Sequence, residues 1–174
     1  MKVGRITLSD RAHSGIYEDR SGPEIERVVD EIFADPIEFV RALLPDEENQ
    51  IVEALRRLAD QDDCALALTT GGTGPAPRDV TPEATRRVLQ KELPGFGEIM
   101  RSLSYARVPT AILSRATAGV RGRCLIINLP GRPSAVRECL SLLGPAIAEC
   151  LDHIRAFRPR LREPKANGAG AAGG

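Results

Sequence analysis

The feature of this sequence that most constrains its fold is a repeated change in the spacing of apolar residues. Short apolar runs typical of strands alternate with longer segments in which apolar residues recur every three or four positions, as they do on one face of a helix. We expect strands at residues 3–8, 37–44, 64–70 and 125–129, and helices at residues 21–34, 46–59, 81–92, 94–104 and 134–154. Strands that alternate with helices form βαβ crossovers. The sequence therefore predicts an α/β protein with a mainly parallel sheet and helices on both of its faces.

Local signals add detail to this outline. Ser21 and Glu24 have the spacing of a capping box at the start of the first helix. The pair Gly144-Pro145 predicts a bend in the last helix, because proline removes a helical hydrogen bond. Before the last strand, residues 113–123 are expected to form a loop that holds a short strand.

Length and charge limit the classes of protein to which the chain can belong. With 174 residues, 42% of them hydrophobic and 28% charged, the chain has enough apolar material for one soluble domain with a core. Its 24 basic and 24 acidic residues cancel, and aromatic residues make up 3%, so neither general nucleic-acid binding nor base stacking is expected. No apolar run is long enough to span a bilayer and no signal peptide is recognisable. We therefore expect a cytoplasmic protein that does not bind membranes.

The body of the chain and its end differ in composition. Residues 1–156 carry the alternating pattern and are expected to form one domain. Residues 157–174 combine prolines, a basic cluster and a Gly/Ala-rich ending. Such a composition cannot build a core, so we expect a flexible, basic tail.

Ligands of open α/β sheets bind beyond the carboxyl ends of the parallel strands. That rule directs attention to the loops at residues 9–22, 45–46, 71–81 and 130–134, each of which follows a predicted strand. The longest of them begins with Ser9, a candidate binding residue at the start of a polar stretch. A solvated loop is the alternative interpretation of that stretch.

The third of these loops has the composition of an anion-binding turn. In TTGGTGPAPRDVTPEAT, residues 69–85, three glycines occur within four positions between a strand and a helix. Glycines let the backbone approach a ligand closely, and freed N–H groups, threonine hydroxyls and a helix dipole all favour an anion. The candidate phosphate-binding residues are Thr70, Gly71, Gly72, Thr73, Gly74 and Arg78. A tight turn would explain the glycines alone, but Arg78 beside Asp79 favours a phosphate together with a divalent cation.

Two aspartates at the ends of different strands are candidate metal ligands. Asp46 follows the second predicted strand, and Asp79 lies in the glycine-rich loop after the third. An N-cap of the next helix is the alternative role of Asp46. If the two carboxylates converge at the edge of the sheet, they can hold Mg²⁺ over a triphosphate. Further candidates for substrate contacts, in and after the last strand, are Asn128, Pro130, Gly131 and Arg132.

A zinc site and a histidine-dependent triad are not expected. The chain has two histidines, His13 and His153, and no Cys/His cluster. The four cysteines form no CxxC pair and lie in apolar stretches, so we interpret them as thiols that fill the core. They are Cys64, Cys124, Cys139 and Cys150.

Six stretches of the sequence occur in the same order in a known family. They are SDRAHSG (residues 9–15), LLPDE (43–47), TTGGTGPAPRDVTPEAT (69–85), LPGFGEIMR (93–101), PTAILSRATAG (109–119) and INLPGRPSAVRECL (127–140). Through them the chain resembles the MoaB/Mog family of molybdenum-cofactor biosynthesis proteins, and it is most similar to the molybdopterin adenylyltransferases of that family. The resemblance implies the family fold, a three-layer α/β/α sandwich, and assembly as a homotrimer.

The resemblance also implies an activity and the residues that carry it. Transferases of the family take molybdopterin and MgATP, join AMP to the terminal phosphate of the pterin and release pyrophosphate, and the product passes to a molybdenum insertase. By position, Asp46 and Asp79 correspond to the acids on which catalysis depends, and Ser114 lies in an LSR segment that lines the pocket. The alternative is a MoaB-like pterin-binding or trimeric scaffold protein without transferase activity.

Overall fold

A computed structural model describes residues 1–163, and within them a six-stranded sheet has the order β2-β1-β3-β6-β5-β4. The strands that pair in parallel are β1 (Lys2–Leu8), β2 (Glu38–Leu44), β3 (Leu66–Thr70) and β6 (Cys124–Leu129). At the other edge, β5 (Ala118–Arg121) pairs antiparallel with β6, and β4 (Lys91–Glu92) pairs antiparallel with β5. The expectation of a mainly parallel sheet is confirmed.

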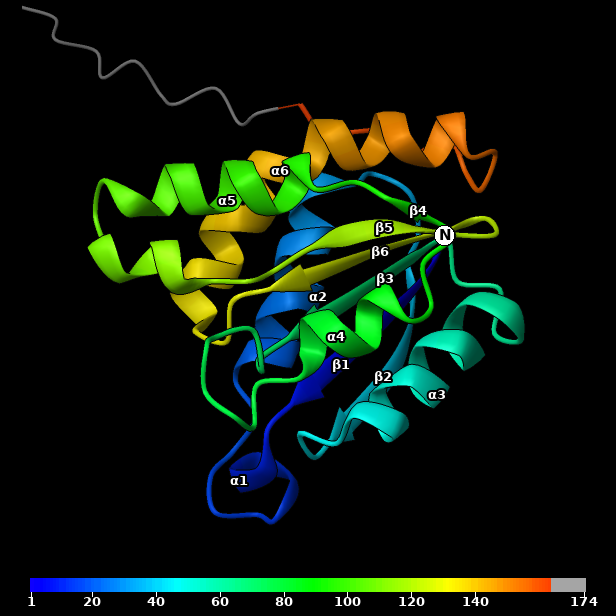
Figure 1. Cartoon of the computed structure of the whole chain (residues 1–174). Helices are drawn as coiled ribbons and strands as arrows, with labels where there is room; N and C mark the ends of the chain where they lie inside the picture. Colours follow the sequence, from blue (N-terminus) through cyan, green and yellow to red (C-terminus); the bar gives the residue numbers. More distant parts are fainter. Residues whose placement is uncertain (164–174) are drawn as a thin grey trace, which may run out of the picture.

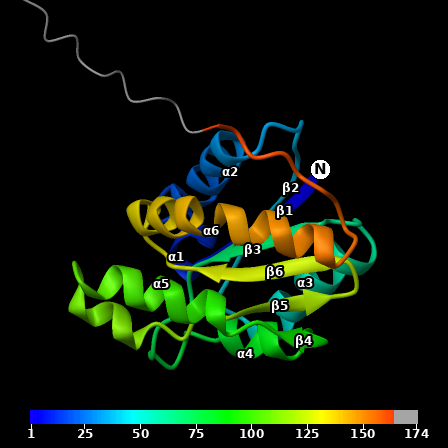
Figure 2. The same cartoon turned by 90° about the horizontal axis from the view of Figure 1, so that it is seen from above.

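Helices cover both faces of the sheet, as Figures 1 and 2 show. They are α1 (Asp10–His13), α2 (Ser21–Ile32), α3 (Glu48–Asp60), α4 (Thr81–Arg86), α5 (Gly95–Tyr105), the 3-10 helix η1 (Pro109–Leu113) and α6 (Pro133–His153). α2 and α6 pack on one face, where α5 lies beside α6, and α3 and α4 pack on the other. The structure therefore has the three layers of the expected α/β/α sandwich.

The two faces of the sheet carry different core residues because successive side chains of a strand point to opposite sides. In β3, Leu66 and Leu68 belong to the core under α2 and α6, whereas Ala67 belongs to the core under α3 and α4. The residues of β6 divide between the two cores in the same alternating way. β3 and β6 are buried throughout and mostly apolar because both faces of the central sheet are covered.

The start of α2 differs from the expected capping box. Ser21 is already helical, and its hydroxyl donates to the carbonyl oxygen of Gly131 at 2.7 Å. Asp19 supplies the cap instead, because its Oδ1 accepts from the backbone N–H groups of Ser21 (3.0 Å) and Gly22 (2.9 Å). Glu24 forms ion pairs with two arginines rather than reaching back to the helix start. A carboxylate upstream of the helix therefore satisfies the end groups that spacing had assigned to Ser21.

α4 is shorter than expected, and its predicted continuation to Glu92 is wrong. The helix ends at Arg86, and Lys91 and Glu92 form β4, which pairs with β5. Pairing with the sheet satisfies backbone groups that a longer helix would have bonded internally. β5 itself is the short strand expected within residues 113–123.

The long helix α6 contains Pro145, and Figure 1 shows its axis turning partway along, in agreement with the predicted bend. Gly144, the preceding residue, lies where α6 approaches α2. A Cβ atom added at Gly144 would lie 2.9 Å from Cγ2 of Ile32. The small residue therefore allows the close packing of the two helices.

The end of the described chain packs against α2. Of the predicted tail at 157–174, residues 157–163 are described and the remainder lies outside the described residues. Arg160 pairs with Asp35 at 3.1 Å, and the backbone N–H of Arg162 donates to the last turn of α2 at 2.7 Å. These contacts carry the packed part of the chain beyond the boundary that composition suggested, because arginine side chains find carboxylate and carbonyl partners on the domain.

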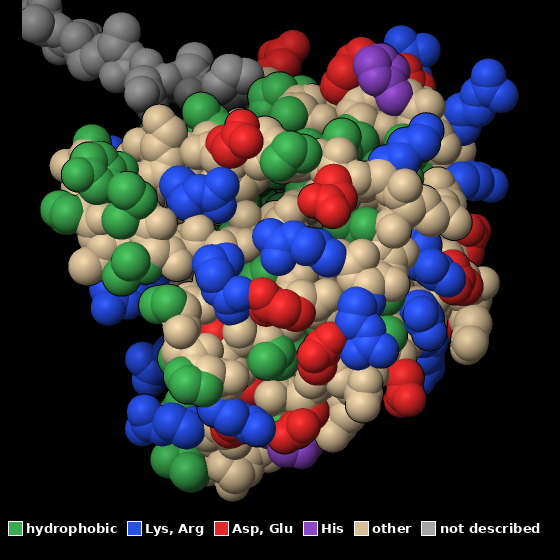
Figure 3. All heavy atoms as spheres, in the orientation of Figure 1, with side chains coloured by type: hydrophobic (Ala, Val, Ile, Leu, Met, Phe, Trp, Pro, Cys, Tyr) green, Lys and Arg blue, Asp and Glu red, His purple; other side chains and the backbone are tan. Residues whose placement is uncertain are grey.

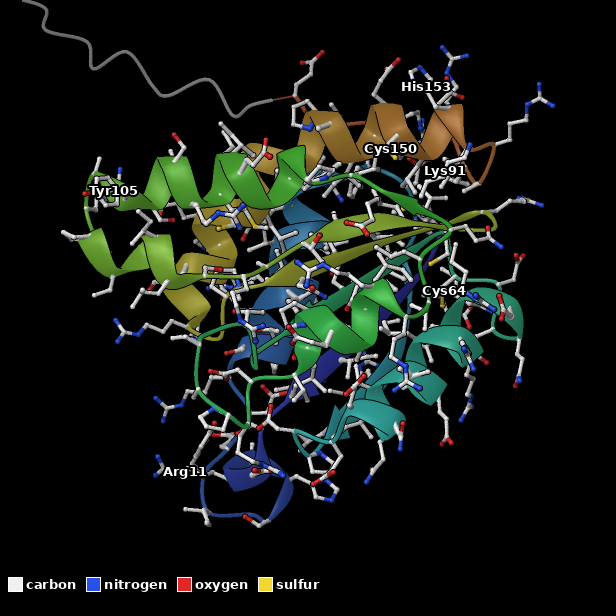
Figure 4. The ribbon with its side chains drawn as sticks, in the orientation of Figure 1. Arg11, Cys64, Lys91, Tyr105, Cys150 and His153 are labelled. Carbon is white, nitrogen blue, oxygen red and sulfur yellow. The ribbon has the colours of Figure 1, made fainter. Side chains whose placement is uncertain are left out.

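The cysteines fill the core, as expected. Cys64, Cys124 and Cys139 are buried and Cys150 is half-buried, and all four are free thiols. Figure 4 shows Cys64 next to α3 and Cys150 on α6, in separate parts of the molecule. Burial raises the pKa of Cys64 to about 11, so this side chain is a neutral thiol near pH 7. Within residues 1–163, no helix combines the length and the apolar character needed to cross a bilayer.

The parallel strands end level with one another. Their register pairs Leu8 with Leu44, Thr7 with Thr70, and Thr70 with Leu129. The four loops that follow these strands therefore emerge at the same end of the sheet, which lies toward the lower left in Figure 1. This is the edge at which ligands bind in open α/β sheets.

Candidate active site

A cavity of about 570 Å³ opens at this end of the sheet. The expected site residues in its lining are Ser9, Asp46, Thr70, Gly71, Gly72, Asp79, Gly131 and Arg132. They come from the ends of four different strands, so the topology of the sheet brings them together. We call this space the acidic cavity, because Asp19, Asp46 and Asp79 all line it.

A second cavity, of about 590 Å³, lies between the glycine-rich loop and the helices α5, η1 and α6, and we call it the α5 cavity. The expected site residues in its lining are Thr73, Gly74, Ser114, Pro130, Gly131 and Arg132. Arg101 and Arg107 add positive charge to its wall, and Met100 adds apolar surface. Gly131 and Arg132 line both cavities, so their turn forms the common wall.

The glycines of the third loop are required by close approach as well as by backbone conformation. Gly71 has φ +100° and Gly72 has φ +62°, in the region that side chains rarely adopt. A Cβ atom on Gly71 would lie 2.2 Å from the carbonyl oxygen of Leu8. One on Gly72 would lie 2.3 Å from Oγ1 of Thr81 and 2.9 Å from Oδ1 of Asp46. The loop therefore passes directly over β1 and against one of the two candidate acids.

Asp46 is held by a reciprocal pair of hydrogen bonds with Asp10. Its Oδ2 accepts from the N–H of Asp10 at 3.1 Å, and its own N–H donates to Oδ1 of Asp10 at 3.0 Å. Its Oδ1 is buried and has no hydrogen-bond partner. Burial raises the pKa of Asp46, and the negative charges of Asp10 and Asp79 act in the same direction. The alternative role as a helix N-cap is excluded, because α3 begins after Glu47 and Asp46 makes no capping bond.

Asp79 offers the second carboxylate of the acidic cavity. Its Oδ2 accepts from the backbone N–H of Ala76 at 2.9 Å, which leaves the other oxygen free of hydrogen bonds in the described residues. Within the described residues no three His, Cys, Asp or Glu side chains form a metal-binding group. Mg²⁺ at nucleotide sites takes one or two carboxylates and completes its shell with phosphate oxygens and water. The unpaired Oδ1 of Asp46 and the carboxylate of Asp79 fit that donor set.

Arg78 does not point into either cavity, contrary to the expectation that it binds phosphate. Its guanidinium donates to both carboxylate oxygens of Asp10, at 2.9 and 3.1 Å, and pairs with Glu47 at 2.9 Å. This pairing lowers the pKa of Asp10. Asp10 in turn holds Asp46, so Arg78 connects three loops of the site rather than offering its charge to a ligand.

Two residues of the first loop also belong to the site, although the sequence did not single them out. The carboxylate of Asp19 accepts from the Thr7 hydroxyl at 2.7 Å and pairs with Arg5 at 3.0 Å, in addition to capping α2. Tyr17 lines the acidic cavity, and its hydroxyl lies 2.7 Å from Oγ of Ser9. Both are polar residues within a polar stretch, and only their long-range partners distinguish them from solvated loop residues.

Asn128 does not reach either cavity, so a direct substrate contact is not supported. Its side chain is fully buried, and Nδ2 donates to the hydroxyl oxygens of Thr69 at 3.0 Å and Thr85 at 2.8 Å. These bonds join β6 to β3 and α4 beneath the glycine-rich loop. Thr70, another expected contact, donates its hydroxyl to the carbonyl oxygen of Pro130 at 2.6 Å and so holds the turn of the common wall.

We expect the variant Asp46→Asn to melt at a higher temperature than the wild type near neutral pH. The pKa of Asp46 lies above its ordinary value in the folded protein, so the ionised carboxylate destabilises the fold once the pH exceeds that pKa. Asparagine removes this charge and its repulsion by Asp10 and Asp79. The gain should shrink as the pH falls toward 3.8, where the wild-type carboxyl also becomes neutral. Thermal melts over a pH series measure it, and a lower melting temperature for the variant at neutral pH would contradict the prediction.

Comparison with known proteins gives relatives over almost the whole chain. The family described as "Probable molybdopterin binding domain" matches residues 4–149. A molybdopterin adenylyltransferase of Helicobacter pylori is 50% identical over 170 residues, which cover 91% of this chain and 97% of the relative. A molybdopterin adenylyltransferase of Escherichia coli K12 is 41% identical over 184 residues, with 92% and 94% covered. Among solved structures, the molybdopterin biosynthesis enzyme MoaB from Thermus thermophilus has a TM-score of 0.83 and 42% identity, covering 91% of this chain and 99% of that one.

Proposed function

The chain belongs to the family of molybdopterin binding domains, and on that premise we propose that it is a molybdopterin adenylyltransferase. It transfers AMP from MgATP to the terminal phosphate of molybdopterin and releases pyrophosphate. Relatives that carry this name are 41% to 50% identical over more than nine-tenths of the chain. The observation in the structure that carries the proposal is the pair Asp46 and Asp79 beside the glycine-rich loop, with one buried carboxylate oxygen left unpaired.

The residues of the acidic cavity suit a metal-bound triphosphate. Asp46 and Asp79 would hold Mg²⁺, which would neutralise charge on the phosphates as it develops. Gly71 and Gly72 form part of the wall of this cavity, and because glycine has no side chain their backbone N–H groups would be open to phosphate oxygens, whereas Thr73 and Gly74 line the α5 cavity. Arg132 is exposed and lines both cavities, so its positive charge can pair with phosphate groups bound in either of them.

The arrangement of the two cavities suits a reaction between two bound substrates. The attacking phosphate oxygen of molybdopterin must line up with the α-phosphorus of ATP, and the bond to pyrophosphate must break on the opposite side. Because the cavities share Gly131 and Arg132, two ligands can meet at this wall. Alignment and charge neutralisation are the main contributions that a protein makes to such a transfer.

The alternative is a pterin-binding or scaffold protein of MoaB type without transferase activity. It is favoured by the likeness to the Thermus thermophilus enzyme MoaB. A scaffold, however, has no need for a half-buried carboxylate with an unpaired buried oxygen and a pKa raised by burial, and Asp46 is such a group. Residues that cost stability at a cavity wall are typical of sites that bind or catalyse.

Incubation of the protein with molybdopterin and MgATP tests the proposal. We expect pyrophosphate and adenylylated molybdopterin to form in equal amounts, and neither to form when molybdopterin or Mg²⁺ is left out. The variant Asp46→Asn, which is expected to be folded and more stable, serves as the inactive control. Binding of molybdopterin by the wild type without pyrophosphate release would favour the alternative.

We also propose that the product passes to a molybdenum insertase and that both steps take place in the cytoplasm. The same family resemblance that suggests the reaction suggests this partner. Co-purification of the protein with the insertase from cell extract, dependent on molybdopterin and ATP, would support the transfer. If the insertase uses free adenylylated molybdopterin as efficiently as product made by this protein in the same mixture, the proposed direct transfer is wrong.

The protein is expected to be a homotrimer. α6 offers little apolar surface for assembly, because most of its large apolar residues are buried in the core and Leu142 is 39% exposed. Apolar surface gathers instead on α5 and η1, as Figure 3 shows around the position that Figure 4 labels Tyr105. The exposed residues there are Ile99, Tyr105, Val108, Ile112 and Leu113. Symmetric assembly would bury such a surface.

Light scattering coupled to size exclusion should give three times the chain mass of 18.8 kDa. The variant Ile112→Glu, which places a charge in the apolar patch, should lower that mass. Ile16→Glu is the matched control, since Ile16 is 66% and Ile112 is 64% exposed but Ile16 lies in the first loop. A monomeric wild type at micromolar concentration would contradict the prediction.

A further inference from the structure

We infer that Arg115 is a positioning residue for the adenylyl transfer: it holds the glycine-rich loop in the shape that presents Asp79 to the acidic cavity. The inference rests on the proposed function, because that function is what requires Asp79 at a defined place. Arg115 lies between η1 and β5 and lines neither of the two large cavities. It therefore acts through the loop rather than on a substrate.

The contacts of Arg115 span the loop from one end to the other. Its backbone N–H donates to the carbonyl oxygen of Thr73 at 2.8 Å. Its Nε donates to the carbonyl oxygen of Gly74 at 2.8 Å, and its Nη2 donates to the carbonyl oxygen of Asp79. Its Nη1 pairs with Glu83 in α4. One side chain thus ties together the start of the loop, its end and the helix that follows.

The loop needs such a tie because its own backbone can form few hydrogen bonds. Pro75 and Pro77 have no N–H to donate. At its ends the loop is closed by Thr81, whose N–H donates to Gly72 at 3.1 Å and whose hydroxyl donates to Gly71 at 2.9 Å. Between residues 73 and 79 it bonds to itself through the N–H of Asp79, which donates to Ala76 at 2.9 Å, and through the N–H of Ala76, which donates to the Asp79 carboxylate at 2.9 Å. The side chain of Asp79 is therefore part of the loop structure, and whatever fixes the loop also fixes the carboxylate.

The chemistry of these contacts calls for arginine in particular. A guanidinium presents several N–H donors in a rigid plane, so it can bond two carbonyl oxygens and a carboxylate at once. The ammonium of lysine is a point charge on a flexible stem and cannot span the same three acceptors in fixed directions. Replacement by lysine keeps the charge of Arg115 but loses the geometry.

Arg115 is itself anchored from the opposite side by α5. The Nη1 atom of Arg101 donates to the carbonyl oxygens of Ser114 at 3.2 Å and Ala116 at 3.1 Å, the two residues that flank Arg115. α5 also approaches this segment closely, since a Cβ atom on Gly97 would lie 2.2 Å from the carbonyl oxygen of Ala116. The segment is therefore a fixed base from which Arg115 holds the more exposed loop.

The test compares Arg115→Lys with Arg86→Lys. Arg86 is the matched control, because it also approaches Glu83, at 3.9 Å, but makes no bond to the loop. We expect Arg115→Lys to lower kcat at least about tenfold with little change in KM for molybdopterin, since a misplaced reacting group slows the chemical step most. We expect amide hydrogen exchange in residues 73–79 to rise at least about tenfold while β3 stays protected. Arg86→Lys should change neither measurement, and both variants should melt within about 2 °C of each other.

Hydrogen exchange makes the inference independent of the activity. If the wild type releases no pyrophosphate, the proposed function fails, and exchange in the loop still decides whether Arg115 positions it. If the wild type is active but Arg115→Lys shows normal kcat and normal exchange, the positioning role is wrong and the proposed function stands. Should Arg115→Lys unfold, Glu83→Gln keeps the arginine and weakens the partner that orients it. Unchanged exchange of the loop in that variant would overturn the inference, and raised exchange would support it.

Discussion

We expect the variant Asp79→Asn to release pyrophosphate at least about a hundredfold more slowly than the wild type, because one positioned electrostatic group is lost. Asparagine has nearly the same shape, so it can still accept the hydrogen bond from Ala76 and keep the loop in place. What it loses is the negative charge that, with Asp46, would hold Mg²⁺ over the triphosphate. The measurement is steady-state pyrophosphate release at saturating molybdopterin and MgATP.

A change of charge elsewhere should have no such effect. Asp63→Asn removes the same charge from the turn after α3, at a residue whose positive φ of 52° asparagine tolerates. It should be active and as stable as the wild type. Near-normal turnover of Asp79→Asn would show that this carboxylate does not hold the metal, although the protein would still be an adenylyltransferase.

Gly71→Ala should lower the free energy of unfolding by at least about 2 kcal/mol, because strain and a backbone clash add at one position. The residue has φ +100°, and its new Cβ would lie 2.2 Å from the carbonyl oxygen of Leu8. The carbonyl oxygen of Leu8 belongs to the backbone and not to a flexible side chain, so either β1 or the loop must move to relieve the clash. Denaturant unfolding measures the loss, and binding of ATP should weaken with it, because the loop would withdraw from the cavity.

Gly122→Ala separates the two causes. Gly122 also has a positive φ, +55°, but nothing lies within 4 Å of the position of its Cβ. Its replacement should therefore cost about 1 kcal/mol from backbone strain alone. If Gly71→Ala costs no more than Gly122→Ala, the close approach of the loop to β1 does not restrict this position.

The layers of the fold follow from local patterns in the sequence. β3 and β6 are mostly apolar because both faces of the central sheet are covered. α2 and α3 have one apolar face because only one side of each helix packs on the sheet. The errors lie at element ends. Asp19 rather than Ser21 caps α2, and Glu92 pairs with β5 rather than continuing α4. At those points local preference is weak and the partner is distant in the chain.

The candidate site divides in the same way. Asp46, Asp79 and the glycines could be placed at one edge of the sheet because parallel strands must end at the same side. The sequence predicts that Arg78 binds phosphate, but its guanidinium pairs instead with the carboxylate of Asp10, which lies 68 residues away in the chain. Arg115 belongs to the LSR segment that the family resemblance placed at the pocket, but nothing in the sequence indicates its partners, since they are carbonyl oxygens of a loop that precedes it by 36 to 41 residues.

Composition and periodicity thus account for the α/β class, the three layers and the edge at which a ligand binds, because burial and backbone geometry act over a few neighbouring residues. They could not assign the partner of each charged side chain. An arginine meets carboxylates or carbonyl oxygens according to which loops the sheet brings side by side, and its own sequence neighbourhood carries no trace of them. For that reason Arg78 and Arg115 became interpretable as ties between loops, and Asn128 as a buried link between β6, β3 and α4, only once the chain was folded.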